Sequence, residues 1–427
     1  MAKNVEGMCG DLMRPRWFFM LVLALSALAC RPEAARGQEE LGRALARLAP
    51  VFGEPTLCPR EGKEDIYEIA RRYEVSASDL FNANEGDLEL GDELLVIPLA
   101  RIAPVARAEG VVVNLTERAL YFYRDGRPVN RLPVATGMRG WETPTGDYAI
   151  ANRVKNPTWF PPAWAVEEEP VPPGPENPLG DRWMGLSIRG YGIHATNAPW
   201  SVGRYLSHGC MRMYPEHARD LYELVKVGTP VKIVYARVVF GFRPEEGIVY
   251  MAHYPDPYRM GKVRKERVRE HLDEYGLGWA AELEAVARAL EMPTGVPIGI
   301  LGSRTKVVVN GREVEFALGP TRVGSDWLVP AGPLAAALRA QMEVGPRGDY
   351  VVIMRDKDRL FFSPGDAEML VNGRLVRAGA AARLAAGHPL VPLKATARGL
   401  GSSVGWDEWT DTVLVWDGWA IGRERGL

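Results

Sequence analysis

The chain of 427 residues is poor in the residues that hold disulfide-rich and zinc-stabilised proteins together. It contains four cysteines, Cys9, Cys30, Cys58 and Cys210, and six histidines. Four cysteines are too few for a disulfide scaffold in a chain of this length, and no CxxC pair indicates a zinc site. A disulfide between Cys58 and Cys210 would need their Cα atoms within about 7 Å. Such a disulfide could form only if the modules that carry the two cysteines touch.

The chain also lacks an excess of charge of either sign. It has 52 basic and 54 acidic residues, a formal net charge of −2. No block of lysines and arginines indicates binding to nucleic acid or to an anionic lipid surface. The hydrophobic fraction of 47% and the charged fraction of 25% are those of a globular protein. The length predicts several domains, and the 33 prolines and 45 glycines favour β-rich modules joined by turns.

Residues 1–30 have the pattern of an export signal. Two arginines precede an uncharged apolar run over 17–29, which is shorter than the about 20 residues that span a bilayer but suits a signal peptide. Small residues mark a cleavage point before Cys30. The sequence Leu-Ala-Cys that ends at Cys30 loosely resembles a lipobox, so Cys30 is a candidate for lipidation and membrane anchoring. The alternatives are an uncleaved anchor and a signal with an incidental cysteine.

Residues 57–100 have the pattern of a small βααβ unit. Apolar positions recur at helical spacing over 66–73, a second helix can follow, and residues 88–98 read as a turn into a strand. The segments IYEIARRYEVSASDLFNAN and LELGDELLVIP resemble a LysM module, which implies binding to glycan strands that contain N-acetylglucosamine. The alternative is a spacer that binds nothing. Residues 31–56 show no clear strand pattern and are expected to be a linker.

Residues 109–236 have the pattern of a second, β-rich domain. The segments 111–115 and 119–123 are strand-like, and Asp125-Gly126 after them is a strong hairpin turn. A proline-rich loop then runs from Lys155 to Gly180. Loops of this length usually serve a function or are disordered.

A histidine and a cysteine of this domain can form a catalytic pair. His194 and Cys210 are 16 positions apart, and Ser207-His208-Gly209 comes directly before the cysteine. A thiol that attacks a carbonyl needs a base to take its proton and donors to hold the oxyanion. A histidine on a neighbouring strand can be the base, and backbone N–H groups beside Gly209 can be the donors. The alternative is a buried inert thiol with structural histidines.

The wider pattern resembles a known enzyme family. The segment GIHATNAPWSVGRYLSHGCMRM closely matches the signature of L,D-transpeptidases of the YkuD type. The resemblance implies that Cys210 is the nucleophile and that His194 takes its proton and later protonates the leaving D-alanine. It also implies that the N–H groups of Gly209 and Cys210 hold the oxyanion.

The resemblance assigns the other residues of the motif to the site as well. Ser207, His208 and Gly209 would form the active-site turn, with Ser207 as a stabilising hydroxyl. Arg212 would secure either this turn or a carboxylate of the substrate, and a structural ion pair is the alternative. Further candidates to line the substrate pocket are Thr196, Asn197 and Ser201.

These assignments predict an exported enzyme of the cell wall or envelope that cross-links peptidoglycan. Its partners would be peptidoglycan stem peptides and glycan strands. A thioester on Cys210 would form with release of D-alanine, the loop 155–180 would act as a lid, and no metal or other cofactor is needed. One alternative is an L,D-carboxypeptidase or endopeptidase that acts on the same stem peptides. The other is a non-catalytic, cell-wall-binding adaptor.

Residues 294–427 contain an internal repeat. Val309-Asn310-Gly311-Arg312 recurs at 371–374, and the sequence Leu-Val-Pro at 328–330 recurs at 390–392, both at an offset of 62. The repeat resembles the duplicated module named after the N-terminal domain of copper amine oxidases. One histidine and no cysteine provide no copper site here, so we expect a spacer or surface-binding module. Residues 237–293 before it are expected to extend the preceding sheet and then form a helical connector, with one charged helix over about 262–291.

The predicted fold is therefore multidomain and mainly β. It comprises a β-rich L,D-transpeptidase catalytic domain, a small βααβ LysM-like module and a duplicated α+β C-terminal module.

Overall fold

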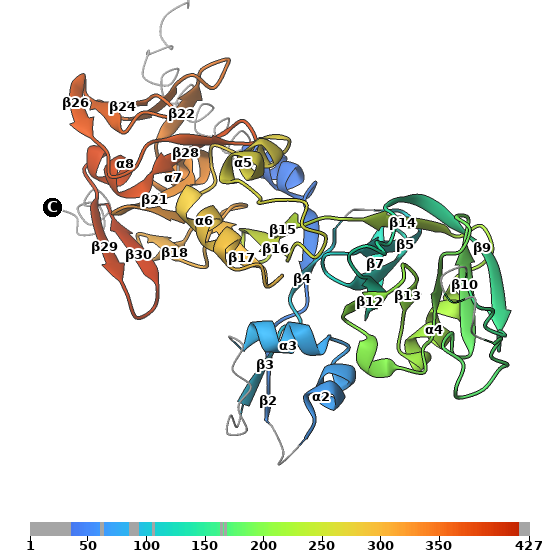
Figure 1. The fold of residues 1–427 in the computed structure, drawn as a ribbon. Helices are drawn as coiled ribbons and strands as arrows, with labels where there is room; N and C mark the ends of the chain where they lie inside the picture. Colours follow the sequence, from blue (N-terminus) through green and yellow to red (C-terminus); the bar gives the residue numbers. More distant parts are fainter. Residues whose placement is uncertain are drawn as a thin grey trace, which may run out of the picture. The chain divides into compact units, whose positions relative to one another are not determined.

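The computed structural model describes residues 36–59, 64–84, 94–104, 107–162, 165 and 169–417. The predicted signal peptide, with Cys9 and Cys30, lies outside the described residues. Contacts divide the chain into two compact units (Figure 1). Among the described residues, one unit is formed by those within 44–303, and the other by residues 304–417 with residues 36–43. Among the described helices, none has the length and apolarity needed to cross a membrane.

The larger unit is built on a sheet of eight strands, which confirms the β-rich prediction for residues 109–236. The turn Asp125-Gly126 joins two of its strands with φ values of 51° and 75°, as the predicted two-residue hairpin requires. The strand order is β13-β11-β10-β9-β14-β5-β6-β7. The bounds are β5 Gly110–Asn114, β6 Ala119–Arg124, β7 Arg127–Pro133, β9 Gly146–Lys155, β10 Arg182–Leu186, β11 Gly192–His194, β13 Met211–Arg212 and β14 Pro230–Val234.

One helix and a short strand pair complete this domain. Helix α4, Pro215–Leu224, starts with a proline at its first position and places Ala218 and Leu221 in the core. Ile193 and Met211, from strands β11 and β13, are fully buried in the same core. This packing fixes strand β11, which carries His194, and strand β13, which directly follows Cys210. Strands β8 Thr136–Gly137 and β12 Tyr205–Ser207 pair in parallel, with the short 3-10 helix η1 Pro199–Ser201 before β12.

The small module has the βααβ order that its sequence pattern predicts. Strands β2 Thr56–Pro59 and β3 Leu94–Ile97 pair antiparallel, and helices α2 Ile66–Arg72 and α3 Ala77–Ala83 lie between them in sequence. Its core includes Cys58. Helix α3 begins with a reciprocal capping box, in which the side chains of Ser76 and Asp79 each bond the other's backbone N–H. Glycan binding by this module stays a prediction.

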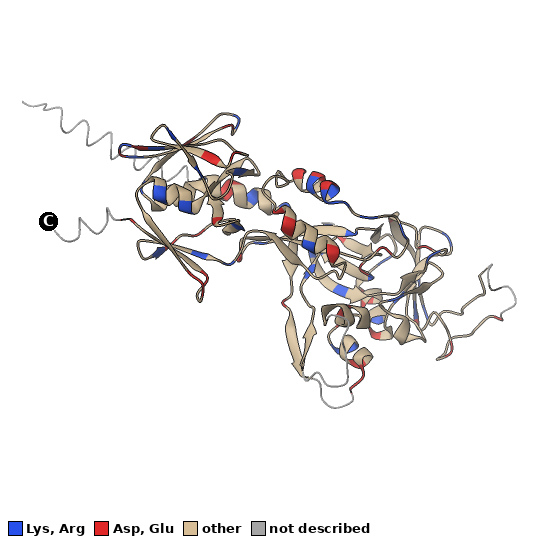
Figure 2. Ribbon diagram, turned by 60° about the vertical axis from the view of Figure 1, so that its left-hand side comes forward, with Lys and Arg blue, Asp and Glu red and all other residues tan. Residues whose placement is uncertain are grey.

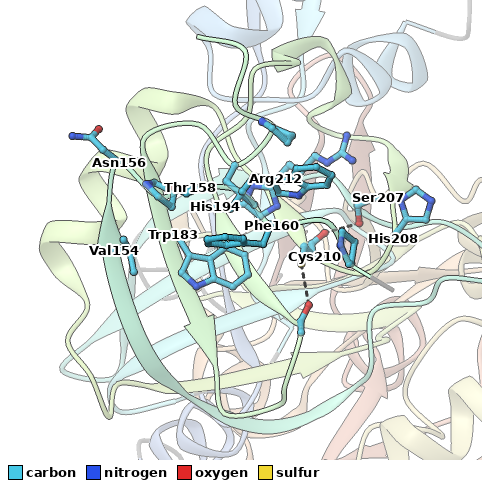
Figure 3. Close-up of a pocket in the computed structure, with 16 residues that line it drawn as sticks. Val154, Asn156, Thr158, Phe160, Trp183, His194, Ser207, His208, Cys210 and Arg212 are labelled. Carbon is cyan, nitrogen blue, oxygen red and sulfur yellow. Dashed lines mark hydrogen bonds between the residues drawn. The ribbon is translucent and has the colours of Figure 1, made fainter. Parts of the chain in front are cut away.

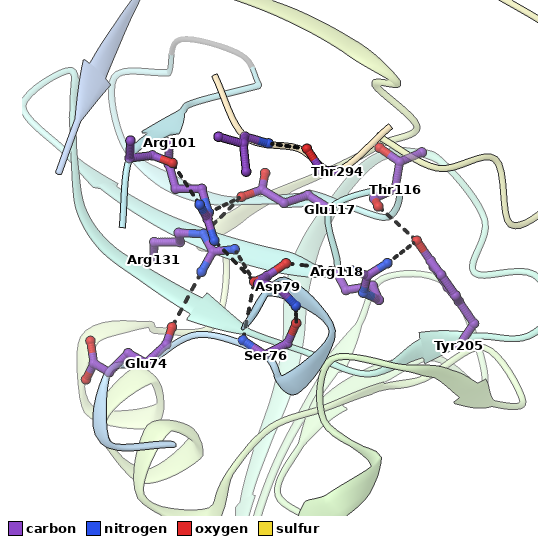
Figure 4. A network of polar contacts seen from close by, with 12 residues as sticks. Glu74, Ser76, Asp79, Arg101, Thr116, Glu117, Arg118, Arg131, Tyr205 and Thr294 are labelled. Carbon is purple, nitrogen blue, oxygen red and sulfur yellow. Dashed lines mark hydrogen bonds and ion pairs between the residues drawn. The ribbon is translucent and has the colours of Figure 1, made fainter. Parts of the chain in front are cut away.

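A buried ionic network joins the small module to the catalytic sheet (Figure 4). The Asp79 carboxylate lies 3.3 Å from Arg101, 3.3 Å from Arg131 and 3.7 Å from Arg118. Glu117 pairs with Arg131 at 2.9 Å. Burial by itself would raise the pKa of Asp79, but the three guanidinium groups outweigh it and lower this pKa to about 2. The module is therefore held to the catalytic domain by charges that water screens little.

A separate sheet of five strands differs from two predictions. Its order is β17-β16-β15-β1-β4, so residues 237–293 do not extend the catalytic sheet. The expected linker 31–56 contains a helical segment over 36–45 and strand β1, which lies between β15 and β4. Only Val51 of the four residues of β1 is buried. The strand therefore lacks the alternation of apolar and polar residues by which a strand is predicted from sequence. The bounds are β1 Ala49–Phe52, β4 Arg101–Ile102, β15 Val238–Arg243, β16 Ile248–His253 and β17 Ile298–Leu301.

The predicted single helix over 262–291 is two helices, α5 Lys265–Asp273 and α6 Leu283–Glu291. Gly276, with φ of 71°, lies between them in the left-handed conformation that ends a helix. Helix α5 carries closely spaced charges of both signs, and Figure 2 shows such mixing of charge over the described chain.

The second unit confirms the internal repeat. Each of the first six elements of one copy has a counterpart that begins 62 residues later, as β18 at Lys306 and β25 at Glu368 illustrate. The first hairpin of copy one pairs with the last hairpin of copy two, because β18 and β30 are parallel neighbours. Copy one comprises β18 Lys306–Val309, β19 Arg312–Glu313, β20 Thr321–Val323, β21 Asp326–Pro330, α7 Ala331–Ala337, β22 Gln341–Val344 and β23 Val351–Arg355. Strand β24 Asp358–Phe362 precedes copy two, which comprises β25 Glu368–Val371, β26 Arg374–Arg377, β27 Arg383–Ala385, β28 His388–Pro392, α8 Leu393–Gly399, β29 Ser403–Asp407 and β30 Thr412–Trp416.

Candidate active site

A row of four side chains crosses strands β9, β10, β11 and β13 at the edge of the catalytic sheet. The strand registers place Val154 opposite Trp183, Trp183 opposite His194, and His194 opposite Arg212. Residues that face each other across strands share a face of the sheet, and all four line one pocket (Figure 3). Cys210 directly precedes strand β13 and lines the same pocket. The sheet thus brings the predicted nucleophile and base into one pocket.

A second row across these strands contains two glycines, and they leave the space that the Trp183 side chain occupies. Gly185 faces Asn152 on one side and Gly192 on the other. A Cβ atom on Gly192 would lie 2.5 Å from the Trp183 ring, and one on Gly185 would lie 2.9 Å from the indole nitrogen. The indole therefore covers both glycines, and its N–H donates to the Asn152 side chain at 2.9 Å. Its ring stacks on His194 with centroids 5.8 Å apart.

His194 is held in one tautomer. Its Nδ1 atom lies 2.5 Å from the Ala195 carbonyl oxygen. A carbonyl can only accept a hydrogen bond, so Nδ1 carries the proton and Nε2 keeps its lone pair. His194 is 4% exposed, and this burial, aided by the positive charge of Arg212, lowers its pKa to about 4. At neutral pH His194 is an uncharged base.

The Cys210 thiol is also uncharged in the resting site. Burial raises its pKa, although the Gly192 N–H and the Arg212 charge favour the thiolate. Its Sγ–H group donates to the Gly190 carbonyl at 3.5 Å, and the cysteine is free. Cys58, the other described cysteine, is free and buried in the small module. With both pKa values shifted against charge, the resting pocket holds an uncharged thiol and an uncharged imidazole.

The turn before Cys210 is fixed by a serine hydroxyl. The Ser207 Oγ atom accepts from the Gly209 N–H at 3.1 Å and donates to the Cys210 carbonyl at 2.5 Å. Gly209 has φ of 109°, and a Cβ atom there would lie 2.5 Å from the Tyr191 ring, so this position requires glycine. The Gly209 N–H, one of two predicted oxyanion donors, is thus used within the turn. The Cys210 N–H has no hydrogen-bond partner among the described residues.

The pocket has a volume of about 810 Å³. Its lining from the predicted motif is His194, Ser207, His208, Cys210 and Arg212, and the proline-rich loop adds Trp159 and Phe160. The His208 ring meets the edge of Trp141 at 4.9 Å. In the described part of the chain, no three His, Cys, Asp or Glu side chains are grouped to hold a metal.

The buried Asn177 side chain organises the proline-rich loop. Its amide nitrogen lies within hydrogen-bond distance of the carbonyls of Pro157 (2.8 Å), Val171 (3.1 Å) and Pro172 (3.1 Å). Its Oδ1 atom accepts from the Leu179 N–H at 2.8 Å. One fully buried amide therefore joins both ends of the loop that carries Trp159 and Phe160 over the pocket.

Three predicted pocket residues do not line the pocket. Thr196 accepts from the Ala198 N–H at 3.0 Å, and Ser201 donates to the Ala198 carbonyl at 2.7 Å. Asn197 donates to the Glu176 carbonyl at 3.0 Å. These side chains stabilise the turn after His194, and Asn197 ties it to the loop. Sequence reasoning in turn missed Trp183, although Gly185 and Gly192 at matching strand positions were a signal for a large neighbour.

Comparisons with known proteins identify the families that two parts of the chain match. Residues 108–233 match the family described as the L,D-transpeptidase catalytic domain. Residues 308–415 match the family described as the copper amine oxidase N-terminal domain. The chain is 30% identical over 275 residues to the probable L,D-transpeptidase ErfK/SrfK of Salmonella typhimurium, covering 60% of this chain and 89% of that protein. It is 34% identical over 211 residues to the probable L,D-transpeptidase YbiS of Escherichia coli, covering 46% and 69%.

A solved structure with detectable similarity is the catalytic domain of an Enterococcus faecium L,D-transpeptidase. It is 24% identical and covers 30% of this chain and 98% of its own, with a TM-score of 0.25.

Proposed function

The chain belongs to the L,D-transpeptidase family, and we propose that it forms peptidoglycan cross-links through a thioester on Cys210. The observation that supports the proposal is that His194, at the end of strand β11, and Cys210, directly before strand β13, line one pocket. This is the arrangement that an activated thiol requires.

The proposed reaction begins with a tetrapeptide stem in the pocket. The Cys210 sulfur attacks the carbonyl at the L-centre of the diamino acid as the thiol proton passes to His194 Nε2. The oxyanion is held by the Cys210 N–H. His194 then gives the proton to the D-alanine nitrogen, the peptide bond breaks, and a thioester remains. An acceptor amine attacks the thioester, His194 takes a proton from that amine, and the thiol regains it as the new amide bond forms.

Arg212 is proposed to bind a carboxylate of the stem peptide. Its side chain lines the pocket and has no hydrogen bond or ion pair to any described residue. A partly buried guanidinium without a counter-charge is a strong site for a carboxylate. This supports substrate binding over the alternative of a structural ion pair.

The loop over the pocket is proposed to favour transfer to an amine over hydrolysis. Trp159 and Phe160 line the pocket, and apolar side chains there limit the water that could reach the thioester. If water attacked instead, the same residues would act as an L,D-carboxypeptidase. The ratio of the two products therefore depends on the loop.

The test is product analysis with the full chain and a purified disaccharide-tetrapeptide. We expect a cross-linked dimer and free D-alanine, no product from Cys210→Ala, and normal product from the matched variant Cys58→Ala. A carbapenem should add to the peptide that contains Cys210 and to no other peptide. Restoration of cross-links by Cys210→Ala in a strain deficient in them would contradict the proposal and favour the adaptor, whereas cleavage of existing dimers by the purified chain would favour the endopeptidase.

Export and glycan binding are proposed on sequence evidence. The signal pattern over 1–30 suits an enzyme whose substrate lies outside the cytoplasmic membrane, and the LysM-like module suits a protein bound to glycan strands. Labelled fatty acid that enters the protein but not Cys30→Ala would identify a lipid anchor. Loss of sedimentation with insoluble peptidoglycan after deletion of residues 57–98 would identify glycan binding.

A further inference from the structure

A tyrosine beyond the catalytic family match reaches back to the active-site turn. Tyr258 follows strand β16, whereas the match ends at residue 233. Its ring stacks on Tyr235 with centroids 5.1 Å apart and planes at 19°. Its backbone N–H donates to the Tyr235 hydroxyl at 3.1 Å, and that hydroxyl donates to Asp256 at 2.6 Å. Asp256 also accepts from two backbone N–H groups after Tyr258, so the Tyr258 ring is held in one position.

The Tyr258 hydroxyl closes the loop that lies under the catalytic turn. It donates to the Gly137 carbonyl at 3.0 Å and accepts from the Thr143 N–H at 3.3 Å. These two groups are the two ends of the loop 137–143. Inside the loop, the Gly137 N–H donates to the Thr143 hydroxyl at 2.9 Å. The Tyr258 hydroxyl thus bridges both ends of a loop that is already closed by the hydrogen bond between Gly137 and Thr143.

This loop holds the peptide unit before the nucleophile. The Thr143 hydroxyl, which is 2% exposed, donates to the Gly209 carbonyl at 2.8 Å. In a trans peptide the C=O and N–H groups point in opposite directions. A bond that holds the Gly209 carbonyl toward Thr143 therefore directs the Cys210 N–H away from Thr143. The Met138 N–H, from the same loop, also donates to the Ser207 carbonyl at 2.9 Å.

We propose that Tyr258 is a positioning residue that orients the Cys210 N–H for the oxyanion. It acts through the Gly137 carbonyl, Thr143 and the Gly209 carbonyl, and it does not touch the reacting atoms. The inference rests on the proposed acyl transfer, in which this N–H is the oxyanion donor not already used within the turn. Donors aimed at developing charge help catalysis only if their direction is fixed before the reaction.

The experiment compares two reactions of the same thiol. Attack on a carbapenem develops an oxyanion, whereas alkylation by iodoacetamide does not. Tyr258→Phe keeps the ring stack and removes the hydroxyl, so we expect carbapenem acylation to slow about 5- to 20-fold, the effect of about one hydrogen bond. Alkylation of Cys210 should be unchanged. Thr143→Val should act like Tyr258→Phe, and Thr143→Ser, which keeps the hydroxyl, should restore acylation.

Tyr250→Phe is the matched control. It removes a tyrosine hydroxyl that bonds Glu246 in the five-stranded sheet and should leave both rates unchanged. Equal slowing of acylation and alkylation by Tyr258→Phe would show a merely structural role and overturn the inference. Wild-type rates of both reactions would overturn it as well. Failure of the unmodified chain to react with either the carbapenem or the stem peptide would instead contradict the proposed function.

Discussion

The indole of Trp183 stacks on the imidazole of His194, with ring centroids 5.8 Å apart and ring planes inclined at 30°. The two residues face each other across strands β10 and β11. The contact shields from water the ring that is proposed to act as the base. Burial is the largest cause of the low pKa of His194. Trp183 therefore influences the pH range in which His194 can act as a base.

The first prediction concerns the acid limit of activity. His194 works as a base only when it is uncharged, that is, above its pKa of about 4. At pH 5 about nine-tenths of a group with this pKa is uncharged, against a few per cent for an ordinary histidine near 6.5. The rate of carbapenem acylation should therefore hold down to about pH 5 and halve near pH 4. A midpoint near 6.5 would contradict this account.

The second prediction tests the role of Trp183. Trp183→Ala admits water to His194, which should raise the pKa of His194 toward its ordinary value. The acid midpoint of acylation should then move from about 4 toward about 6.5, and the plateau rate should fall roughly 10-fold as the ring loses its support. Trp183→Phe keeps an aromatic face over His194 and is the control. An unchanged midpoint in Trp183→Ala would show that other groups dominate the burial.

The third prediction concerns the network around Asp79. Asp79→Asn leaves three buried guanidinium groups with Glu117 alone, which should lower the free energy of unfolding by about 3 kcal/mol. Urea unfolding measures this change. The control Glu223→Gln removes an exposed ion pair with Lys155 and should cost less than about 1 kcal/mol. A loss no larger than that of the control would contradict a stabilising role.

The same network gives stability a defined pH dependence. The pKa of Asp79 is lower in the folded chain, about 2, than its ordinary value of 3.8. The stabilisation is therefore fully present above about pH 4 and is lost as pH falls through 2. The difference between the unmodified chain and Asp79→Asn should shrink over this window. As the pH is lowered, activity should therefore be lost near pH 4, before the network around Asp79 loses its stabilising effect.

The fourth prediction concerns the loop over the pocket. Asn177→Ala removes the amide that joins both ends of the loop, so water should reach the thioester more easily. The ratio of hydrolysed tripeptide to cross-linked dimer should rise several-fold, with acylation of Cys210 changed less. Mass spectrometry of the muropeptides measures the ratio. Asn130→Ala, at an exposed position of strand β7, is the control, and an unchanged ratio in Asn177→Ala would reject the loop as a barrier to water.

Local patterns predict much of the fold. The hairpin at Asp125-Gly126, the βααβ order of the small module and the offset of 62 in the second unit each depend on residues close in sequence or on a repeated spacing, so the amino-acid pattern reveals them. Strand β1 leaves no such pattern, because its pairing with β15 and β4 joins segments far apart in the chain. The prediction of a single helix over 262–291 is wrong, because Gly276 adopts a positive φ after the first helix and ends it.

The sequence by itself determined which groups we propose to be reactive, His194 and the Ser207–Cys210 turn, because residue type and short spacing indicate their chemistry. Only the tertiary structure decided the protonation state of these groups and which neighbouring residues hold them in position. Charge on His194 and Cys210 depends on burial, which no local pattern records. The contacts that Trp183, Thr143 and Tyr258 make around the site join segments that are far apart in sequence. Such contacts exist only once the chain has folded.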